Sequence, residues 1–141
     1  MEALAVDDLV PPVAAADVAE VASRSVLVVD DRKDLREICC LILEQAGFTV
    51  TEAEDSSNAL RMLNAGPLPE VVLIDVTMPG MSGPDAVATM RDRHPNVTPV
   101  LMTGYSAEAI GAMLEEQGVG LLRKPFNNAE LIAAVNTALA D

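Results

Sequence analysis

The sequence predicts an α/β fold: a five-stranded parallel sheet with helices on both faces. Apolar runs such as residues 71–74 are hydrophobic at every position, which is typical of parallel strands buried on both faces. From Ser25 onward these runs alternate five times with segments of helical periodicity. Half of the 141 residues are apolar, so a single domain of this length can bury a substantial core.

Five short strands are expected, and the third is apolar at every position. In chain order the expected strands are residues 25–29, 48–51, 71–74, 97–102 and 119–122. Short strand–helix connections imply right-handed crossovers between neighbouring parallel strands.

Two helices are expected in the first half of the chain. Apolar residues recur at helical spacing over 35–46, and Gly47 ends that helix. Asp55 is placed to cap a second helix, which ends near Gly66.

Three more helices are expected in the second half. Pro84 suits the first turn of one helix, where its missing N–H has no cost. Ser106 is placed to cap the next, helix four. Asn127 with Glu130 three residues later forms a capping box for the last helix.

Residues 1–23 lack this alternation. They are rich in Ala, Val and acidic residues, with Pro11-Pro12 in the middle. Short isolated helices are marginal in water, so we expect a flexible N-terminal extension followed by one domain over residues 24–141.

Composition excludes several classes of protein. A formal charge of -13 with nine scattered basic residues argues against a nucleic-acid-binding surface. No stretch approaches the ~20 apolar residues of a membrane span, and the acidic start does not resemble a secretory signal. The adjacent Cys39 and Cys40 do not suggest a disulfide framework, so a reducing, cytoplasmic location is expected.

Polar side chains follow the expected strands where parallel strands place a ligand site. Asp30 and Asp31 follow the first strand, Asp75 closes the third, and Lys124 follows the fifth. Close carboxylates repel one another unless a cation neutralises them, and oxygen ligands suit Mg²⁺. Three acids and one base therefore favour a site for a divalent cation and a phosphoryl group, to which a backbone carbonyl near Thr77 could contribute.

Each of these residues also has an ordinary structural explanation. Asp30 and Asp31 could compensate a helix dipole, and Asp75 could be a turn residue. Thr103, at the end of the fourth strand, could be an ordinary strand hydroxyl, and Lys124 a solvated cation. Their joint occurrence at one sheet edge favours a functional site over four separate coincidences.

Taken together, four motifs resemble the receiver domain of two-component response regulators over about residues 24–140. The motifs are Asp30-Asp31, the stretch from Asp75 to Gly83, Thr103-Gly104-Tyr105 and Lys124-Pro125-Phe126. The resemblance implies a flavodoxin-like sheet with strand order 2-1-3-4-5, as in the chemotaxis regulator.

The resemblance also implies site roles. Asp75 would be the phospho-acceptor, and Asp30, Asp31, Asp75 and the Thr77 backbone carbonyl would hold Mg²⁺.

Three further residues would respond to the phosphoryl group. Lys124 would neutralise its oxygens, Thr103 would bond to it, and Tyr105 would rotate inward behind Thr103. These movements and helix four would switch the binding of a partner protein.

The function implied is that of a single-domain response regulator, phosphorylated by a histidine kinase or a histidine phosphotransfer protein. We expect no output domain after Asp141, so output would come from partner binding or from phosphate relay; excision from a longer hybrid kinase is the alternative. Neither nucleic acid nor a membrane is an expected partner.

Two other classes remain open. A Mg²⁺-dependent phosphatase would use an aspartyl-phosphate, but such enzymes often carry an acid where Thr77 stands. We therefore expect a phospho-acceptor that assists its own chemistry and not a turnover enzyme. A constitutive interaction module would never accept phosphate.

Overall fold

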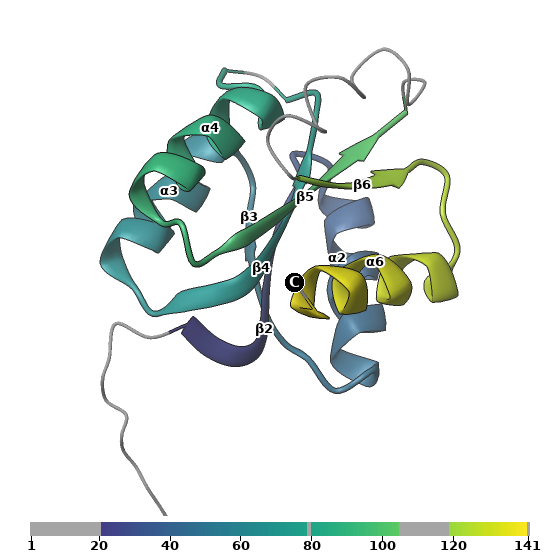
Figure 1. Ribbon diagram of the computed structural model, residues 1–141. Helices are drawn as coiled ribbons and strands as arrows, with labels where there is room; N and C mark the ends of the chain where they lie inside the picture. The colour runs from purple at the N-terminus through teal and green to yellow at the C-terminus, as the bar shows by residue number, and fades with distance from the viewer. Residues whose placement is uncertain (1–20, 79, 105–118, 141) are drawn as a thin grey trace, which may run out of the picture.

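Parallel strands form the central sheet of the computed structural model, which describes residues 21–78, 80–104 and 119–140 (Figure 1). The five strands in these ranges are β2 Val21–Val29, β3 Thr49–Ala53, β4 Leu68–Asp75, β5 Thr98–Thr103 and β6 Gly120–Arg123. Their spatial order is β3-β2-β4-β5-β6, and every neighbouring pair is parallel. This is the predicted 2-1-3-4-5 order.

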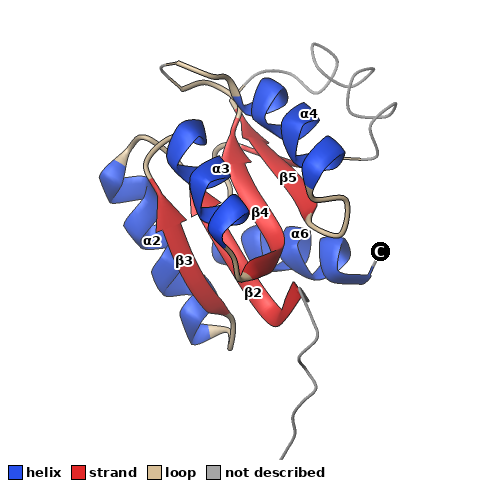
Figure 2. Ribbon diagram, turned by 90° about the vertical axis from the view of Figure 1, so that its left-hand side faces the viewer, coloured by secondary structure: helices blue, strands red, loops and turns tan. Residues whose placement is uncertain are grey.

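Helices cover both faces of the sheet. The helices in the described ranges are α2 Lys33–Gln45, α3 Ser56–Ala65, α4 Gly83–Arg93 and α6 Asn128–Ala140. Figure 2 shows α3 and α4 across one face of the sheet, with α6 behind it. The expected helix four and Tyr105 lie outside the described residues.

Alternate residues of each strand supply two separate cores. On β2, Leu27 and Val29 face the layer of α3 and α4, whereas Val26 and Val28 face the layer of α2 and α6. All four side chains are buried. This two-sided burial explains why residues 26–29 of β2 and 71–74 of β4 are apolar at every position.

The predicted caps at Asp55 and Asn127 form, whereas Ser106 lies outside the described residues. The Asp55 side chain accepts a hydrogen bond from the Asn58 backbone N–H at 2.8 Å. Asn127 and Glu130 each accept one from the other's backbone N–H, at 2.8 and 2.9 Å. Pro84 lies in the first turn of α4. These contacts are local in sequence, which is why residue spacing predicts them.

Two strands begin earlier than expected. Val21 pairs with Leu68 and Ala22 with Pro69, and the register shifts before pairing resumes at Val26. Arg24, with φ of 55°, adopts a left-handed conformation inside this irregularity. The apolar runs begin at Val26 in one strand and at Val71 in the other. They therefore could not predict the strand pairs that lie before them.

Within the described ranges, no helix has both the length and the apolar character needed to cross a lipid bilayer.

Candidate functional site

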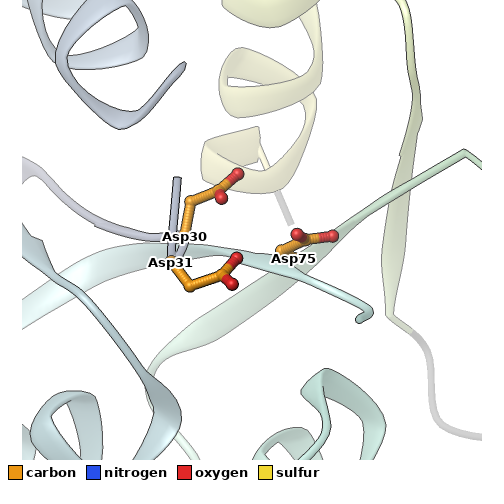
Figure 3. Close-up of side chains that lie close together, drawn as sticks. All are labelled: Asp30, Asp31 and Asp75. Atoms are coloured by element: carbon orange, nitrogen blue, oxygen red, sulfur yellow. The ribbon is translucent and has the colours of Figure 1, made fainter. Parts of the chain in front are cut away.

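Three carboxylates gather where β2 and β4 end. Val29 pairs with Ile74, so the next residues on the two strands, Asp30 and Asp75, lie side by side. One carboxylate oxygen from each of Asp30, Asp31 and Asp75 lies within 4.8 Å of the others (Figure 3). Asp30 and Asp75 are buried and Asp31 is exposed, so the cluster has a buried floor and an open side.

Lys124 reaches the same cluster from the end of β6. Its Nζ lies 3.4 Å from Oδ2 of Asp30 and 3.4 Å from Oδ2 of Asp75. The Lys124 backbone N–H donates to the Thr103 carbonyl at 2.7 Å, which fixes the start of this loop against β5. The bond to Pro125 is cis. One ammonium therefore contacts two of the three carboxylates.

Burial governs the electrostatics of Asp75. Desolvation raises the pKa of Asp75 above its ordinary value, and the nearby Asp30 raises it further. Lys124 and the Thr77 backbone N–H, which donates to Oδ1 at 3.3 Å, lower that pKa without cancelling the effect of burial. Burial therefore disfavours the ionised form of Asp75 in the absence of a cation.

This donor set fits Mg²⁺. Three carboxylates supply hard oxygen ligands on one open-sided cluster, while Lys124 offsets only part of their charge. Mg²⁺ binds a few carboxylates and retains waters, which the exposed side at Asp31 leaves room for.

The loop that carries Asp30 is held from three directions. The Asp30 N–H donates to the Ala53 carbonyl at 3.3 Å, and the Arg32 N–H donates to Asp30 Oδ1 at 2.9 Å. The Arg36 side chain donates from Nη1 to the Asp30 carbonyl at 2.7 Å. Sequence reasoning missed Arg36, although its position on the helix that follows Asp30 offered a hint.

Gly83 brings the start of α4 against the acceptor strand. Its N–H donates to the Val76 carbonyl at 3.0 Å. A β-carbon at Gly83 would collide with the Asp75 carbonyl oxygen and lie 2.9 Å from the Val76 Cα. Gly83 is part of the motif from Asp75 to Gly83, but the motif alone did not explain why glycine stands there. The structure explains it, because two segments of backbone approach too closely for a side chain.

Thr103 ends β5 beside this cluster. It is fully buried, and its strand neighbour Met102 pairs with Asp75. Gly104 follows it, and among the described residues no atom lies within 4 Å of where its β-carbon would stand. Tyr105, the remaining predicted site residue, lies outside the described residues.

Comparison with known proteins places this geometry in a family. A family model described as the response regulator receiver domain matches residues 26–136. The phosphate regulon transcriptional regulatory protein PhoB of Escherichia coli (strain K12) is 34% identical over 120 residues. That match covers 83% of this chain and 52% of PhoB, so the chain spans about half the length of this curated relative.

Solved structures agree. The chemotaxis protein CheY4 of Vibrio cholerae superposes with a TM-score of 0.77 at 28% identity, covering 84% of this chain and 100% of that one. The response regulator TrrA of Thermotoga maritima, solved with Mg²⁺-BeF, gives a TM-score of 0.74 at 29% identity, covering 82% and 99%. The chain therefore belongs to the response regulator receiver domains of two-component systems.

Proposed function

We propose that Asp75 accepts a phosphoryl group from a histidine kinase or a histidine phosphotransfer protein. The observation that carries this proposal is the contact of Lys124 with both Asp30 and Asp75 inside a cluster of three carboxylates. Receiver domains are signalling domains and not classical enzymes, so the phosphorylated chain is itself the product.

In the transfer step, a carboxylate oxygen of Asp75 forms a bond to phosphorus as the P–N bond to the donor imidazole breaks. The imidazole leaves with the electron pair of that bond. The Lys124 ammonium, already 3.4 Å from Asp75 Oδ2, pairs with the phosphoryl oxygens as the group arrives. The Thr77 N–H holds Asp75 Oδ1, which keeps the carboxylate in one orientation.

Asp30, Asp31, Asp75 and the Thr77 carbonyl are the residues we propose to hold Mg²⁺. Bound there, the ion would supply positive charge that offsets the repulsion between the carboxylates and the incoming phosphoryl oxygens. Three carboxylates face a single ammonium, and this excess of negative charge supports the assignment.

The phosphoryl group then acts as a switch. It adds about 1.5–2 negative charges beside Lys124 and the end of β5. We propose that the Thr103 hydroxyl donates to a phosphoryl oxygen, and that Tyr105 and the helix expected after Ser106 follow this movement to change partner binding.

Labelling with a small phosphodonor tests the assignment. Incubated with acetyl phosphate and Mg²⁺, the chain should take up at most one phosphoryl group per molecule, slowly, and Asp75→Asn should abolish uptake. Many turnovers per chain would indicate a Mg²⁺-dependent phosphatase instead. No uptake at all would indicate a constitutive interaction module.

Helix α2 carries an exposed apolar pair on the part of the chain that the structure describes. Ile38 and Leu41 are 54% and 55% exposed, and they are the large hydrophobic side chains exposed in the described part of the chain. Three residues apart on one helix, they lie on the same face. We propose that this apolar face contacts the donor protein, since scattered exposed apolar residues are common but an adjacent pair forms a patch.

The two sources of phosphate separate docking from chemistry. Ile38→Gln with Leu41→Gln should slow labelling by a phosphorylated kinase or phosphotransfer protein at least tenfold, as is typical when an interface loses central apolar contacts. Labelling by acetyl phosphate, which needs no protein surface, should change far less. Equal slowing of both reactions would argue against a docking role for this face.

We also propose a cytoplasmic location, the expectation that follows from a sequence without a disulfide framework.

A further inference from the structure

Arg36 connects the metal-site loop to two other elements. From the start of α2, its Nη1 donates to the Asp30 carbonyl at 2.7 Å and its Nε donates to Glu52 Oε1 on β3, also at 2.7 Å. The Arg36 side chain is only 14% exposed. A single guanidinium therefore joins α2, the edge strand β3 and the loop after β2.

The acceptor on that loop is the carbonyl of the Asp30–Asp31 peptide. A peptide group is planar, so fixing its carbonyl oxygen also fixes the direction in which the chain leaves toward Asp31. Asp30 is additionally anchored through its N–H and its carboxylate. Asp31 is exposed, so the orientation of its backbone depends more on the peptide held by Arg36.

We propose that Arg36 is a positioning residue for the metal site: it holds the Asp30–Asp31 peptide so that both carboxylates face one cation. This inference rests on the proposed function, in which Asp30, Asp31 and Asp75 bind Mg²⁺. Arg36 contacts the backbone of the loop and acts through it.

Charge and positioning make opposite predictions for Arg36. A cation near a cation site repels the metal, so by charge alone its removal would tighten Mg²⁺ binding. Glu52 forms the compensating ion pair and raises the pKa of Arg36, so the two charges largely cancel at the metal. If removing the guanidinium weakens Mg²⁺ binding, the cause is lost geometry.

The experiment is calorimetric titration of the full chain with Mg²⁺ alone. Arg36→Met retains the aliphatic stem and removes both hydrogen bonds; we expect the Kd for Mg²⁺ to rise about tenfold, in the range seen when hydrogen-bond partners of metal ligands are removed. Arg36→Lys keeps the charge, but an ammonium lacks the planar arrangement of donors by which the guanidinium bonds to Asp30 and to Glu52 at the same time. It should weaken binding as well.

A double variant removes the effect of net charge. Arg36→Met with Glu52→Gln deletes one cation and one anion together, so net charge is unchanged. Electrostatics alone predicts an unaltered Kd, whereas positioning predicts a Kd raised as in Arg36→Met. The Mg²⁺ concentration that gives half-maximal labelling of Asp75 should rise in parallel.

Lys33→Met is the matched control. Lys33 is on the same helix, its side chain is 77% exposed, and within the described residues its ion pair is a long 3.9 Å contact with Glu37. Lys33→Met removes one positive charge, as Arg36→Met does, but it leaves the Arg36–Asp30 hydrogen bond in place. The Kd of this variant for Mg²⁺ should therefore stay the same or fall slightly.

The outcomes are distinct. Unchanged or tighter Mg²⁺ binding in Arg36→Met or in the double variant overturns the inference. Should Arg36→Met fail to fold by circular dichroism, Arg36→Lys decides: a wild-type Kd overturns the inference, and a raised Kd supports it. Absence of Mg²⁺ binding in the wild-type chain overturns the proposed function itself, and this inference with it.

Discussion

At Asp75, burial opposes the ionised form that phosphoryl transfer requires. The pKa of Asp75 is raised in the folded chain, mainly by desolvation. The folded state then binds a proton more tightly than the unfolded state, so stability falls as pH rises from about 3.8 through the folded pKa. Near neutral pH the ionised carboxylate therefore destabilises the metal-free fold.

Asp75→Asn should consequently stabilise the metal-free chain. With EDTA at pH 7, we expect a higher melting temperature by a few degrees, since ~1 kcal/mol corresponds to about 4 °C in a domain of this size. Lys124 keeps Asp30 as a partner, so no cation is left unpaired. Thermal melts across pH 4–7 should show a decline in the wild-type chain that is shallower in the variant; a less stable variant would contradict the argument.

The buried hydroxyl of Ser56 also lowers the stability of the fold. The residue is 1% exposed, and its hydroxyl has no hydrogen-bond partner in the described part of the molecule. A buried hydroxyl without a partner costs stability because it loses its bonds to water.

Ser56→Ala should therefore raise the free energy of unfolding by about 1 kcal/mol. The adjacent Ser57, which is exposed, provides the matched control, and Ser57→Ala should change stability by less than about 0.5 kcal/mol. Urea denaturation of both variants measures the difference. A loss of stability in Ser56→Ala would show that the hydroxyl is satisfied.

At the scale of elements, the junction of β4 and α4 brings backbone unusually close to backbone. Gly83 lies against the Asp75 carbonyl and the Val76 Cα. Both neighbours are main chain, so neither can move aside as a flexible side chain would.

Gly83→Ala should therefore destabilise the fold by about 1–3 kcal/mol, the usual cost of overpacking. Gly104→Ala is the control, because no atom of the described residues lies within 4 Å of a β-carbon at that position. Urea midpoints should separate the two variants, and acetyl phosphate labelling of Gly83→Ala should slow because the Asp75 main chain is displaced. Equal midpoints for the two variants would show that α4 can shift to make room for the methyl group without a loss of stability.

Elements also show what sequence can predict. Caps such as Asp55 depend on residues three positions apart, and the sheet-edge acids depend on the rule that parallel strands end at one edge; both are readable without coordinates. The Val21–Leu68 pairing is separated from the rest of the β2–β4 ladder by a register shift. The Arg36–Glu52 contact depends on one side chain that reaches from a helix to a neighbouring strand. Neither leaves a periodic pattern, so neither was predicted.

At the scale of the whole molecule, the metal site couples to folding. The proposed ligands Asp30, Asp31 and Asp75 come from segments about 45 residues apart in sequence, and they meet only when β2 and β4 pair. An ion that binds the folded chain and not the unfolded one stabilises the entire fold by mass action.

Mg²⁺ should therefore raise the melting temperature, and EDTA should reverse the gain. At a concentration one hundred times Kd the expected stabilisation is about 2.7 kcal/mol. Asp31→Asn is the discriminating variant: Asp31 is exposed, so the fold should tolerate the change while the ion loses a charged ligand. Melting curves at increasing Mg²⁺ should shift for the wild-type chain and much less for Asp31→Asn. An equal shift in both would mean that Mg²⁺ acts elsewhere on the acidic surface, because general screening of a chain with formal charge -13 does not depend on one carboxylate.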